Sequence, residues 1–205
     1  MKKKIVNLVQ LSVGNIGSII RILNDLNYEH KIILSPEQFD LDSKIILPGV
    51  GSFDVFMQSL KKQNLHNKIK ELVYNNSKIL GICVGMQSLF KSSEEGKEVG
   101  FGFFNTNCVK FKKNSSIKIP HIGWNKVIFK KKNFLLEAIE DNYFYFTHSY
   151  HINNEIDVKY VLADTNYLYN FPSIVSKNNI YGVQFHPEKS YRQGLQIIKN
   201  FLEKC

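Results

Sequence analysis

The sequence lacks several features that would each assign it to a definite class of protein. Only three of its 205 residues are cysteines, Cys83, Cys108 and Cys205, and they lie too far apart for a disulfide framework or a zinc site. No apolar run approaches the roughly 18 residues that span a bilayer, and no cleavage site follows the basic start Lys2–Lys4. We therefore expect a cytoplasmic protein without a membrane segment, in which at least one cysteine is a working thiol.

Acidic residues are also few, which leaves a strong positive charge. The chain has 27 Lys and Arg residues against 18 Asp and Glu residues, a formal net charge of +9. Such a charge alone could indicate a nucleic-acid ligand, an acidic protein or an anionic substrate. The densest runs, Lys112–Lys113 and Lys130–Lys132, lack the interleaved aromatic side chains on which single strands stack. We therefore interpret the charge as a solvated basic surface. A nucleic-acid-binding module is the least favoured of the alternative functions.

No Pro-, Gly- or Ser-rich linker and no internal repeat divides the chain, of which 43% is hydrophobic. This length and apolar content suit one globular domain over residues 1–205. In the first half, short apolar runs alternate with segments of helical spacing, which indicates βαβ units and a parallel sheet. The expected strands are Ile5–Leu11, Lys31–Leu34, Ile45–Leu47 and Lys78–Ile82, and the expected helices are Ile16–Leu26, Phe53–Tyr74 and Met86–Lys91.

From about Gly100 onwards, strands joined by loops dominate, and we expect several of them to be antiparallel. These strands are Val109–Lys112, Asn125–Phe129, Tyr143–Phe146, Tyr160–Ala163, Ile174–Ser176 and Ile180–Phe185, followed by an amphipathic helix at Gln193–Lys204. The two halves together predict an α/β fold with an open, mixed, largely parallel sheet flanked by helices. In such sheets the functional loops lie at the carboxyl ends of the strands.

The most specific local pattern surrounds Cys83. An apolar strand runs into Gly81-Ile82-Cys83-Val84-Gly85 and then a helix, which is the cysteine version of a nucleophile elbow. Glycines are needed at Gly81 and Gly85 because the sharp turn presses these two positions together. The helix N-terminus favours a thiolate at Cys83, and the N–H of Val84 can help to hold an oxyanion. The alternative is a buried cysteine packed between two glycines.

His186 and Glu188 are the candidates for the base and for the group that orients it. His186 follows an expected strand, so it lies on the same edge as Cys83 if the two strands are parallel. In an extended segment Glu188 points to the same side as His186, so its carboxylate can bind Nδ1 and leave Nε2 facing the thiol. Alone, a His-Pro-Glu turn is more often structural, but with the cysteine elbow it indicates a triad.

A third glycine-rich segment, Pro48-Gly49-Val50-Gly51-Ser52, follows the strand Ile45–Leu47. Its backbone N–H groups can approach a ligand closely, as an oxyanion hole or a carboxylate nest requires. A plain turn after a buried strand explains the segment equally well. No phosphate-binding glycine loop is present, so we expect no cofactor. We also expect no metal, because the remaining histidines show no metal-ligand spacing: His30, His66, His121, His148 and His151.

Taken together, these motifs resemble class I glutamine amidotransferases. Further segments, in the same order along nearly the whole chain, resemble the glutaminase subunits of imidazole glycerol phosphate synthase. These segments are Gly14–Ile16, Pro48–Gly51, Gly81–Gln87, Ser93–Gly96, Pro120–Asn125, Tyr145–Tyr150 and Gln184–Ser190. The resemblance implies a flavodoxin-like fold and a chain that supplies ammonia to a partner synthase.

The resemblance also implies roles for individual residues. Cys83 would attack the glutamine amide, His186 would move the proton to the leaving ammonia, and Glu188 would orient His186. The implied oxyanion hole consists of Val50, Gly51 and Val84, and the implied glutamine-binding residues are Gly49, Gln87, Glu95 and Ser149. The implied partner is a (βα)₈-barrel cyclase, which would form a heterodimer with this chain through Asn15, Trp124, Tyr145 and Lys189.

One stretch departs from the family pattern. Many members have Asp-Tyr-Gly-x-Gly-Asn-Leu-Arg-Ser after the first strand, where this chain has Gln10–Ser18. That loop faces the partner in the family, so the difference bears on which synthase is served. Our first interpretation is a subunit that acts in histidine biosynthesis. The second is a paralogous subunit that supplies ammonia to a barrel enzyme that aminates a surface sugar. A free-standing hydrolase of γ-glutamyl amides and a non-catalytic binding subunit are further alternatives.

Overall fold

The computed structural model describes residues 5–11, 16–112 and 118–205. Its main feature is a nine-stranded sheet with the order β2-β1-β3-β4-β11-β10-β9-β6-β7. The strands are β1 (Ile5–Val9), β2 (Glu29–Ile33), β3 (Lys44–Gly49), β4 (Ile79–Cys83), β6 (His121–Phe129), β7 (Tyr143–His148), β9 (Val161–Tyr167), β10 (Tyr169–Lys177) and β11 (Ile180–Val183). Two short strands, β5 (Cys108–Lys110) and β8 (Tyr150–Ile152), form a separate antiparallel pair.

The parallel half of the sheet consists of β2, β1, β3, β4 and β11. Their order matches the flavodoxin-like arrangement, in which the chain winds outward from β1 in both directions. Apart from the edge strand β2, which is mostly exposed, these strands are largely buried and read as apolar runs, as Ile45 to Leu47 and Ile79 to Ile82 do. β4 pairs in parallel with β11, so the residues that follow these two strands lie at the same edge of the sheet.

The remaining pairs, β11–β10, β10–β9, β9–β6 and β6–β7, are antiparallel. The prediction of a mixed sheet is therefore confirmed, and its antiparallel part extends over as many strand pairs as its parallel part. Several strands are longer than predicted. For example, β6 begins at His121, and β10 extends over Tyr169–Lys177. Partly exposed strands alternate apolar with polar residues, which blurs their ends in the sequence.

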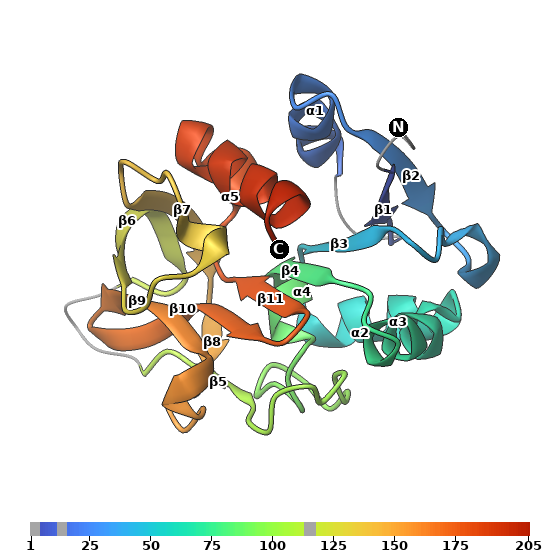
Figure 1. The fold of residues 1–205 in the computed structure, drawn as a ribbon. Coiled ribbons are helices and arrows are strands. Elements are labelled where there is room, and N and C mark those ends of the chain that lie inside the picture. The colour runs from blue at the N-terminus through green and yellow to red at the C-terminus, as the bar shows by residue number, and fades with distance from the viewer. Residues whose placement is uncertain (1–4, 12–15, 113–117) are drawn as a thin grey trace.

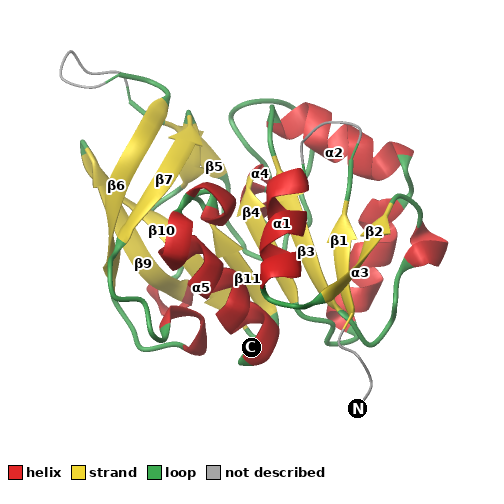
Figure 2. Cartoon of the chain, turned by 90° about the horizontal axis from the view of Figure 1, so that it is seen from above, coloured by secondary structure: helices red, strands yellow, loops and turns green. Residues whose placement is uncertain are grey.

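Helices cover both faces of the parallel half (Figure 1). α1 (Gly17–Asp25) and α5 (Tyr191–Glu203) lie on one face, and α2 (Phe53–Lys62) and α3 (Leu65–Tyr74) lie on the other (Figure 2). Each helix presents an apolar stripe to the sheet, as the buried Ile197, Ile198 and Phe201 of α5 illustrate at their helical spacing. Within the described residues, no helix is long and apolar enough to cross a bilayer.

Two predicted helices were wrong in extent. The stretch predicted as one helix, Phe53–Tyr74, is divided between α2 and α3, because Asn64 has a left-handed backbone with φ 57°. Such a conformation ends an α-helix, and asparagine tolerates it better than most residues do. The helix predicted at Met86–Lys91 is instead the short α4 (Val84–Gln87), after which tighter turns join the amides of Leu89 and Phe90 to the carbonyls of Met86 and Gln87.

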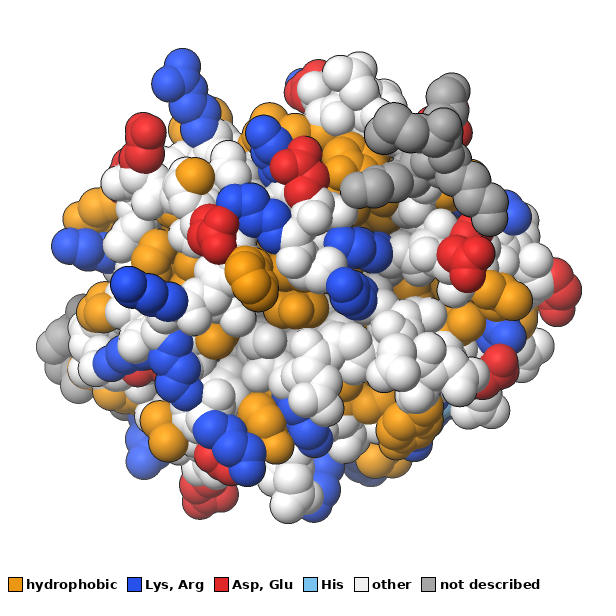
Figure 3. Space-filling model, viewed as in Figure 1, with side chains coloured by type: hydrophobic (Ala, Val, Ile, Leu, Met, Phe, Trp, Pro, Cys, Tyr) orange, Lys and Arg blue, Asp and Glu red, His pale blue; other side chains and the backbone are white. Residues whose placement is uncertain are grey.

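The positive charge does not gather into one patch on the face drawn in Figure 3, where Lys and Arg side chains lie singly or in small groups among acidic, apolar and uncharged atoms. Several lysines have local partners. Lys130 pairs with Asp164, and Lys204 pairs with Glu137. This dispersed pattern is what the interpretation as a solvated basic surface requires on this face.

Candidate active site

Cys83 stands on a strained turn at the end of β4. Its backbone has φ 54° and ψ −112°, a conformation that costs a non-glycine residue energy and occurs mostly at functional sites. A Cβ added at Gly81 would lie 2.6 Å from the Gly85 carbonyl oxygen, and one added at Gly85 would overlap the carbonyl oxygen of Leu47 in β3. Both glycines are therefore required for the turn to pack against its neighbours, as the elbow pattern predicts.

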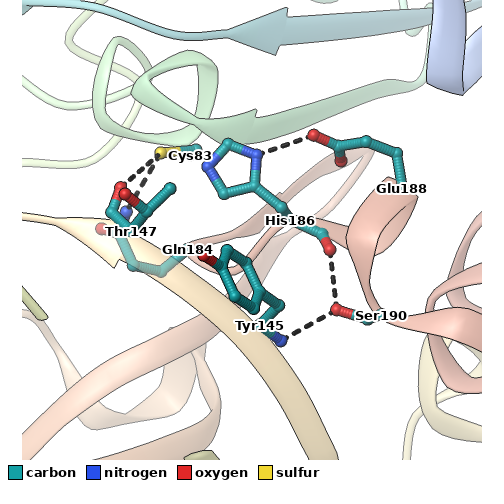
Figure 4. Close-up of polar contacts among 7 residues, drawn as sticks. All are labelled: Cys83, Tyr145, Thr147, Gln184, His186, Glu188 and Ser190. Carbon is teal, nitrogen blue, oxygen red and sulfur yellow. Dashed lines mark hydrogen bonds and ion pairs between the residues drawn. The ribbon is translucent and has the colours of Figure 1, made fainter. Parts of the chain in front are cut away.

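His186 lies three residues beyond β11, beside Cys83. Its Nδ1 donates a 2.7 Å hydrogen bond to Glu188 Oε1, and Figure 4 shows the ring between the Cys83 sulfur and the Glu188 carboxylate. The extended segment that we expected between His186 and Glu188 was wrong. Pro187–Lys189 forms a 3₁₀ turn, η4, which brings the carboxylate back to the imidazole. The predicted contact exists, but a tight turn makes it rather than a strand.

Ser190, which the sequence analysis did not select as a site residue, and Tyr145, which it selected only for the partner interface, hold His186 in place. The Ser190 hydroxyl donates to the His186 carbonyl oxygen at 2.7 Å and accepts from the Tyr145 amide at 3.0 Å. The His186 amide in turn donates to the Tyr145 carbonyl oxygen at 2.9 Å. The histidine backbone is thus fastened to β7, which fixes the direction of its ring (Figure 4).

The surroundings of His186 favour its charged form. Burial lowers the pKa of His186, but the adjacent Cys83 and Glu188 outweigh burial and raise the pKa to about 10. Nε2 is buried, lies on the Cys83 side of the ring and makes no hydrogen bond among the described residues. An imidazolium beside a cysteine is the arrangement that stabilises a thiolate nucleophile.

A pocket of about 310 Å³ opens over Cys83, a size that suits a small ligand such as an amino acid. It contains most of the residues that the sequence analysis selected for oxyanion and glutamine binding. Its lining comprises Val50, Gly51, Cys83, Val84, Gln87, Glu95, Thr147, His148, Ser149, Tyr150, His186 and Lys189. Thr147, His148 and Tyr150 were not predicted as site residues, although they lie within the Tyr145–Tyr150 motif.

Glu95 brings a negative charge to the pocket. Burial raises the pKa of its carboxyl group, against the effect of the Phe53 amide, which donates to Oε2 at 2.7 Å at the start of α2. Among the residues that line the pocket, Lys189 and His186 are the cationic side chains, and neither forms an ion pair with Glu95. A ligand ammonium would therefore meet a partly desolvated carboxylate that lacks a counter-charge.

Gly49 lies at the end of β3, where it pairs with Cys83, and is outside the pocket lining. A Cβ at this position would overlap the Gly85 amide and press on the Phe56 ring. In this structure Gly49 therefore allows β3 to approach the nucleophile turn. Gly51 differs, because it has φ +88° and faces open space at the pocket.

The expected partner-facing residues Trp124, Tyr145 and Lys189 come together at the surface. Trp124 and Tyr145 are opposite one another on β6 and β7, and Lys189 Nζ lies 5.5 Å from the Tyr145 ring centroid. Tyr191, which was not predicted, stacks on Trp124 at 5.1 Å and is 79% exposed. We call Trp124, Tyr145 and Tyr191 the aromatic patch. Asn15 lies outside the described residues.

Comparison with known proteins agrees with this geometry. The family model described as glutamine amidotransferase class-I matches residues 9–205. The chain belongs to the class-I glutamine amidotransferase family. The fold and the family that the motifs suggested are thereby confirmed, as is the prediction that the chain is an amidotransferase enzyme.

Several relatives of this amidotransferase are similar over almost their whole length. Imidazole glycerol phosphate synthase subunit HisH 2 of Methanococcus maripaludis is 45% identical, and the alignment covers 97% of this chain and 98% of the relative. Subunit HisH of Leptospira borgpetersenii is 42% identical over 96% of this chain and 98% of its own. Subunit HisH of Methanocaldococcus jannaschii is 41% identical, with coverages of 97% and 98%.

Solved structures share the fold at low sequence identity. The structure of PurLQS from Thermotoga maritima aligns with a TM-score of 0.75 and 19% identity, covering 98% of each chain. A crystal structure of a glutamine amidotransferase aligns with a TM-score of 0.73 and 17% identity, covering 97% of each chain. The amidotransferase fold is thus retained although most side chains differ.

Proposed function

We propose that this chain is the glutaminase subunit of an imidazole glycerol phosphate synthase and acts in histidine biosynthesis in the cytoplasm. The observation that carries this proposal is the placement of Cys83 beside the hydrogen-bonded pair His186 and Glu188, at the floor of a small pocket. The HisH relatives, which span nearly the whole chain, support the pathway. We further propose that residues 1–205 form one glutamine amidotransferase domain.

In the proposed reaction the Cys83 thiolate attacks the side-chain carbonyl carbon of glutamine. The resulting oxyanion is stabilised by backbone N–H groups of Val50, Gly51 and Val84. His186, protonated as its raised pKa requires, gives its proton to the leaving ammonia, and a γ-glutamyl thioester remains. Neutral His186 then takes a proton from water, which attacks the thioester and releases glutamate. Glu188 keeps Nδ1 occupied, so that Nε2 exchanges the proton.

Substrate binding is assigned to Gly49, Gln87, Glu95 and Ser149. Glu95 would pair with the substrate α-ammonium, because its carboxylate is partly buried and forms no ion pair with a cationic side chain of the pocket lining. Gln87, whose side chain is buried at the pocket, and Ser149 would bind polar atoms of the substrate. Gly49 would contribute through the close approach of the β3 backbone, with its packing role described above.

The partner proposed for this glutaminase is a (βα)₈-barrel cyclase that forms a heterodimer with it and receives the ammonia. Lys189 lines the pocket and also lies over Tyr145, so the aromatic patch adjoins the place where ammonia is released. Exposed aromatic side chains in a group are typical of protein interfaces. Lys189, Trp124 and Tyr145 would therefore contact the cyclase, together with Asn15 from the first loop.

Glutamate release from glutamine tests this function. The wild-type chain and Cys83→Ala are assayed alone, with the barrel cyclase of the histidine pathway, and with that cyclase plus its nucleotide ligand. We expect wild-type activity to rise many-fold with cyclase and ligand and Cys83→Ala to remain inactive throughout. Ser173→Ala, a buried substitution outside the pocket, controls for general damage to the fold.

Other outcomes would redirect the proposal in defined ways. Activation by a different barrel protein alone would retain the chemistry and overturn the pathway. Full glutamine turnover without any partner would favour a free-standing hydrolase. Undiminished activity of Cys83→Ala would remove the nucleophile from the proposal altogether.

A further inference from the structure

Gln184 is a buried side chain in direct contact with the Cys83 sulfur. It follows β11, is 0% exposed, and donates from Nε2 to Cys83 Sγ at 3.8 Å (Figure 4). Its Oε1 accepts from Gln87 Nε2 at 3.2 Å. Both polar atoms of the Gln184 amide therefore make hydrogen bonds: the nitrogen donates to the Cys83 sulfur, and the oxygen accepts from the pocket residue Gln87.

The direction of the Gln184 amide follows from its neighbours. The Tyr150 carbonyl oxygen can only accept a hydrogen bond, so Gln87 must present its NH₂ group there, at 3.0 Å. The second proton of the same NH₂ group points to Gln184, so the Gln184 atom that accepts this hydrogen bond is its oxygen, Oε1. The Gln184 NH₂ group is then left to face the sulfur.

The start of this chain of donors is itself fixed. The Tyr150 carbonyl also accepts from His148 Nδ1 at 2.7 Å. His148 Nε2 is therefore an acceptor, and His121 Nδ1 donates to it at 3.1 Å. His121 Nε2 accepts in turn from Asn125 Nδ2 at 3.2 Å. Burial lowers the pKa of His148 well below its ordinary value and lowers that of His121 to about 4, so both rings stay neutral and the directions persist.

The sulfur of Cys83 therefore has two fixed polar neighbours that respond oppositely to its charge. The Thr147 carbonyl oxygen, 3.9 Å away, can accept the S–H proton of a neutral thiol but repels a thiolate. The Gln184 N–H attracts a thiolate and supports it with a charge-assisted hydrogen bond. Because the amide is neutral, it does this without lowering the positive charge that His186 can carry.

We propose that Gln184 is a further catalytic residue, which stabilises the Cys83 thiolate by donating its side-chain N–H to the sulfur. The inference rests on the proposed function only in taking Cys83 as the nucleophile. Gln87 is a positioning residue. It affects the sulfur indirectly, because it fixes the direction of the Gln184 amide.

The test is the pH dependence of Cys83 alkylation by iodoacetamide, read from the Cys83 peptide by mass spectrometry. Iodoacetamide reacts with the thiolate, so the rate against pH reports its formation. Gln184→Met keeps the length of the side chain and removes the N–H donor. We expect the midpoint to rise by about one pH unit, which slows alkylation by about tenfold at pH values below the wild-type midpoint.

Ser173→Ala is the matched control. Ser173 is also fully buried and lies on β10, and its hydroxyl bonds to Thr165 rather than to Cys83. Its carbonyl oxygen accepts from the Gln184 amide, a backbone bond that alanine keeps, so this variant should retain the wild-type profile. Gln184→Glu is the second test variant, since it keeps an oxygen for Gln87 and turns an oxygen towards the sulfur. Its midpoint should rise at least as far as that of Gln184→Met.

Wild-type alkylation profiles in folded Gln184→Met or Gln184→Glu would overturn the proposal, as would an equal shift in Ser173→Ala. If Gln184→Met does not fold, Gln184→Glu decides by the same criterion. Alkylation needs neither glutamine nor a partner. A wild-type chain that fails to hydrolyse glutamine even with the cyclase and its ligand would therefore contradict the proposed function and leave the result for Gln184 intact.

Discussion

Among single residues, His186 shows most directly how local contacts set a chemical property. Its ring is buried, which by itself favours the neutral form. The neighbours Cys83 and Glu188 reverse that preference and raise its pKa to about 10. The pKa is higher than in an unfolded chain, so the stabilisation by this proton is full below about pH 6.5 and is lost as the pH rises towards 10.

Removal of Cys83 should lower the pKa of His186 more than removal of the Glu188 charge does. Cys83 contributes more to the raised pKa than Glu188. In Cys83→Ala, burial then acts against Glu188 alone. NMR titration of the His186 ring in wild type, Cys83→Ala and Glu188→Gln measures the effect. A wild-type ring that titrates at about 6.5, the value of a free histidine, would contradict this account of the site.

His121 illustrates the opposite case. Burial lowers its pKa to about 4, and the hydrogen bonds to His148 and Asn125 need its neutral form. The unfolded chain binds this proton near pH 6.5 and the folded chain does not, so stability is present above pH 6.5 and is lost as the pH falls towards 4.

We therefore expect the free energy of unfolding to fall by about 3 kcal/mol between pH 6.5 and pH 4 because of His121. Urea unfolding at several pH values measures the slope. His121→Gln, which can still donate and accept but does not titrate, should have a shallower slope. Equal slopes for the two proteins would show that His121 is not the group responsible.

Among the elements, the contact between α5 and η4 supports the turn that joins His186 to Glu188, two members of the proposed triad. A Cβ at Gly194 of α5 would overlap the carbonyl oxygen of Pro187, which lies between His186 and Glu188. Only a glycine lets the helix approach this turn so closely. The helix therefore contributes to the position of His186 and Glu188, two members of the proposed triad that it does not itself contain.

Gly194→Ala should push α5 away from the turn and lower the cyclase-activated glutaminase rate by about tenfold or more, while the protein remains folded. We also expect a loss of about 1–3 kcal/mol in stability from the forced overlap. Arg192→Ala, an exposed position in the same helix, is the control and should change neither quantity appreciably. Wild-type activity in Gly194→Ala would show that this contact does not position the triad.

The sequence predicted best those elements whose signal is local. The apolar runs of β1, β3 and β4 and the amphipathic pattern of α1 and α5 appear close to their expected places. The position of Cys83 followed from the two glycines that the turn needs. In contrast, the division at Asn64 depends on one left-handed residue, and η4 depends on packing against α5. Neither produces a periodic pattern.

The site residues also fall into those that a local motif predicts and those whose contacts depend on tertiary packing. Cys83, His186 and Glu188 stand in motifs, and the structure brings His186 and Glu188 to 2.7 Å. Gln184 lies in the same motif, but its contact with Cys83 joins β11 to β4 across 101 positions of sequence. Tyr191 gains its stacking on Trp124 only when α5 and β6 are placed together. Such contacts follow from tertiary packing, which residue spacing does not encode.

At the scale of the whole molecule, the two halves of the mixed sheet contribute different parts of the site. The parallel half provides Cys83, the proposed nucleophile, and the edge at which His186 meets it. The antiparallel half provides β7, which bonds to the His186 backbone through Tyr145, and β6, whose Trp124 lies opposite Tyr145. The pocket therefore lies where the two halves meet, next to the aromatic patch.

Tyr191→Ala should weaken binding of the barrel cyclase by about tenfold or more, because exposed aromatic residues at the centre of an interface contribute strongly to affinity. Isothermal titration calorimetry measures the dissociation constant. Tyr74→Ala is the matched control, since Tyr74 is 68% exposed at the end of α3, on the other face of the sheet. Equal affinities for the two variants would place the interface elsewhere.

The central claim is that Cys83 is the nucleophile that attacks glutamine. The most direct test is covalent labelling by a glutamine analogue with a diazoketone in place of the amide, with peptides analysed by mass spectrometry. We predict one label per chain, on Cys83, that glutamine suppresses and that Glu95→Gln slows because the α-ammonium loses its partner. Labelling of Cys108 or Cys205 with Cys83 unmodified, or labelling that glutamine does not suppress, would contradict the account.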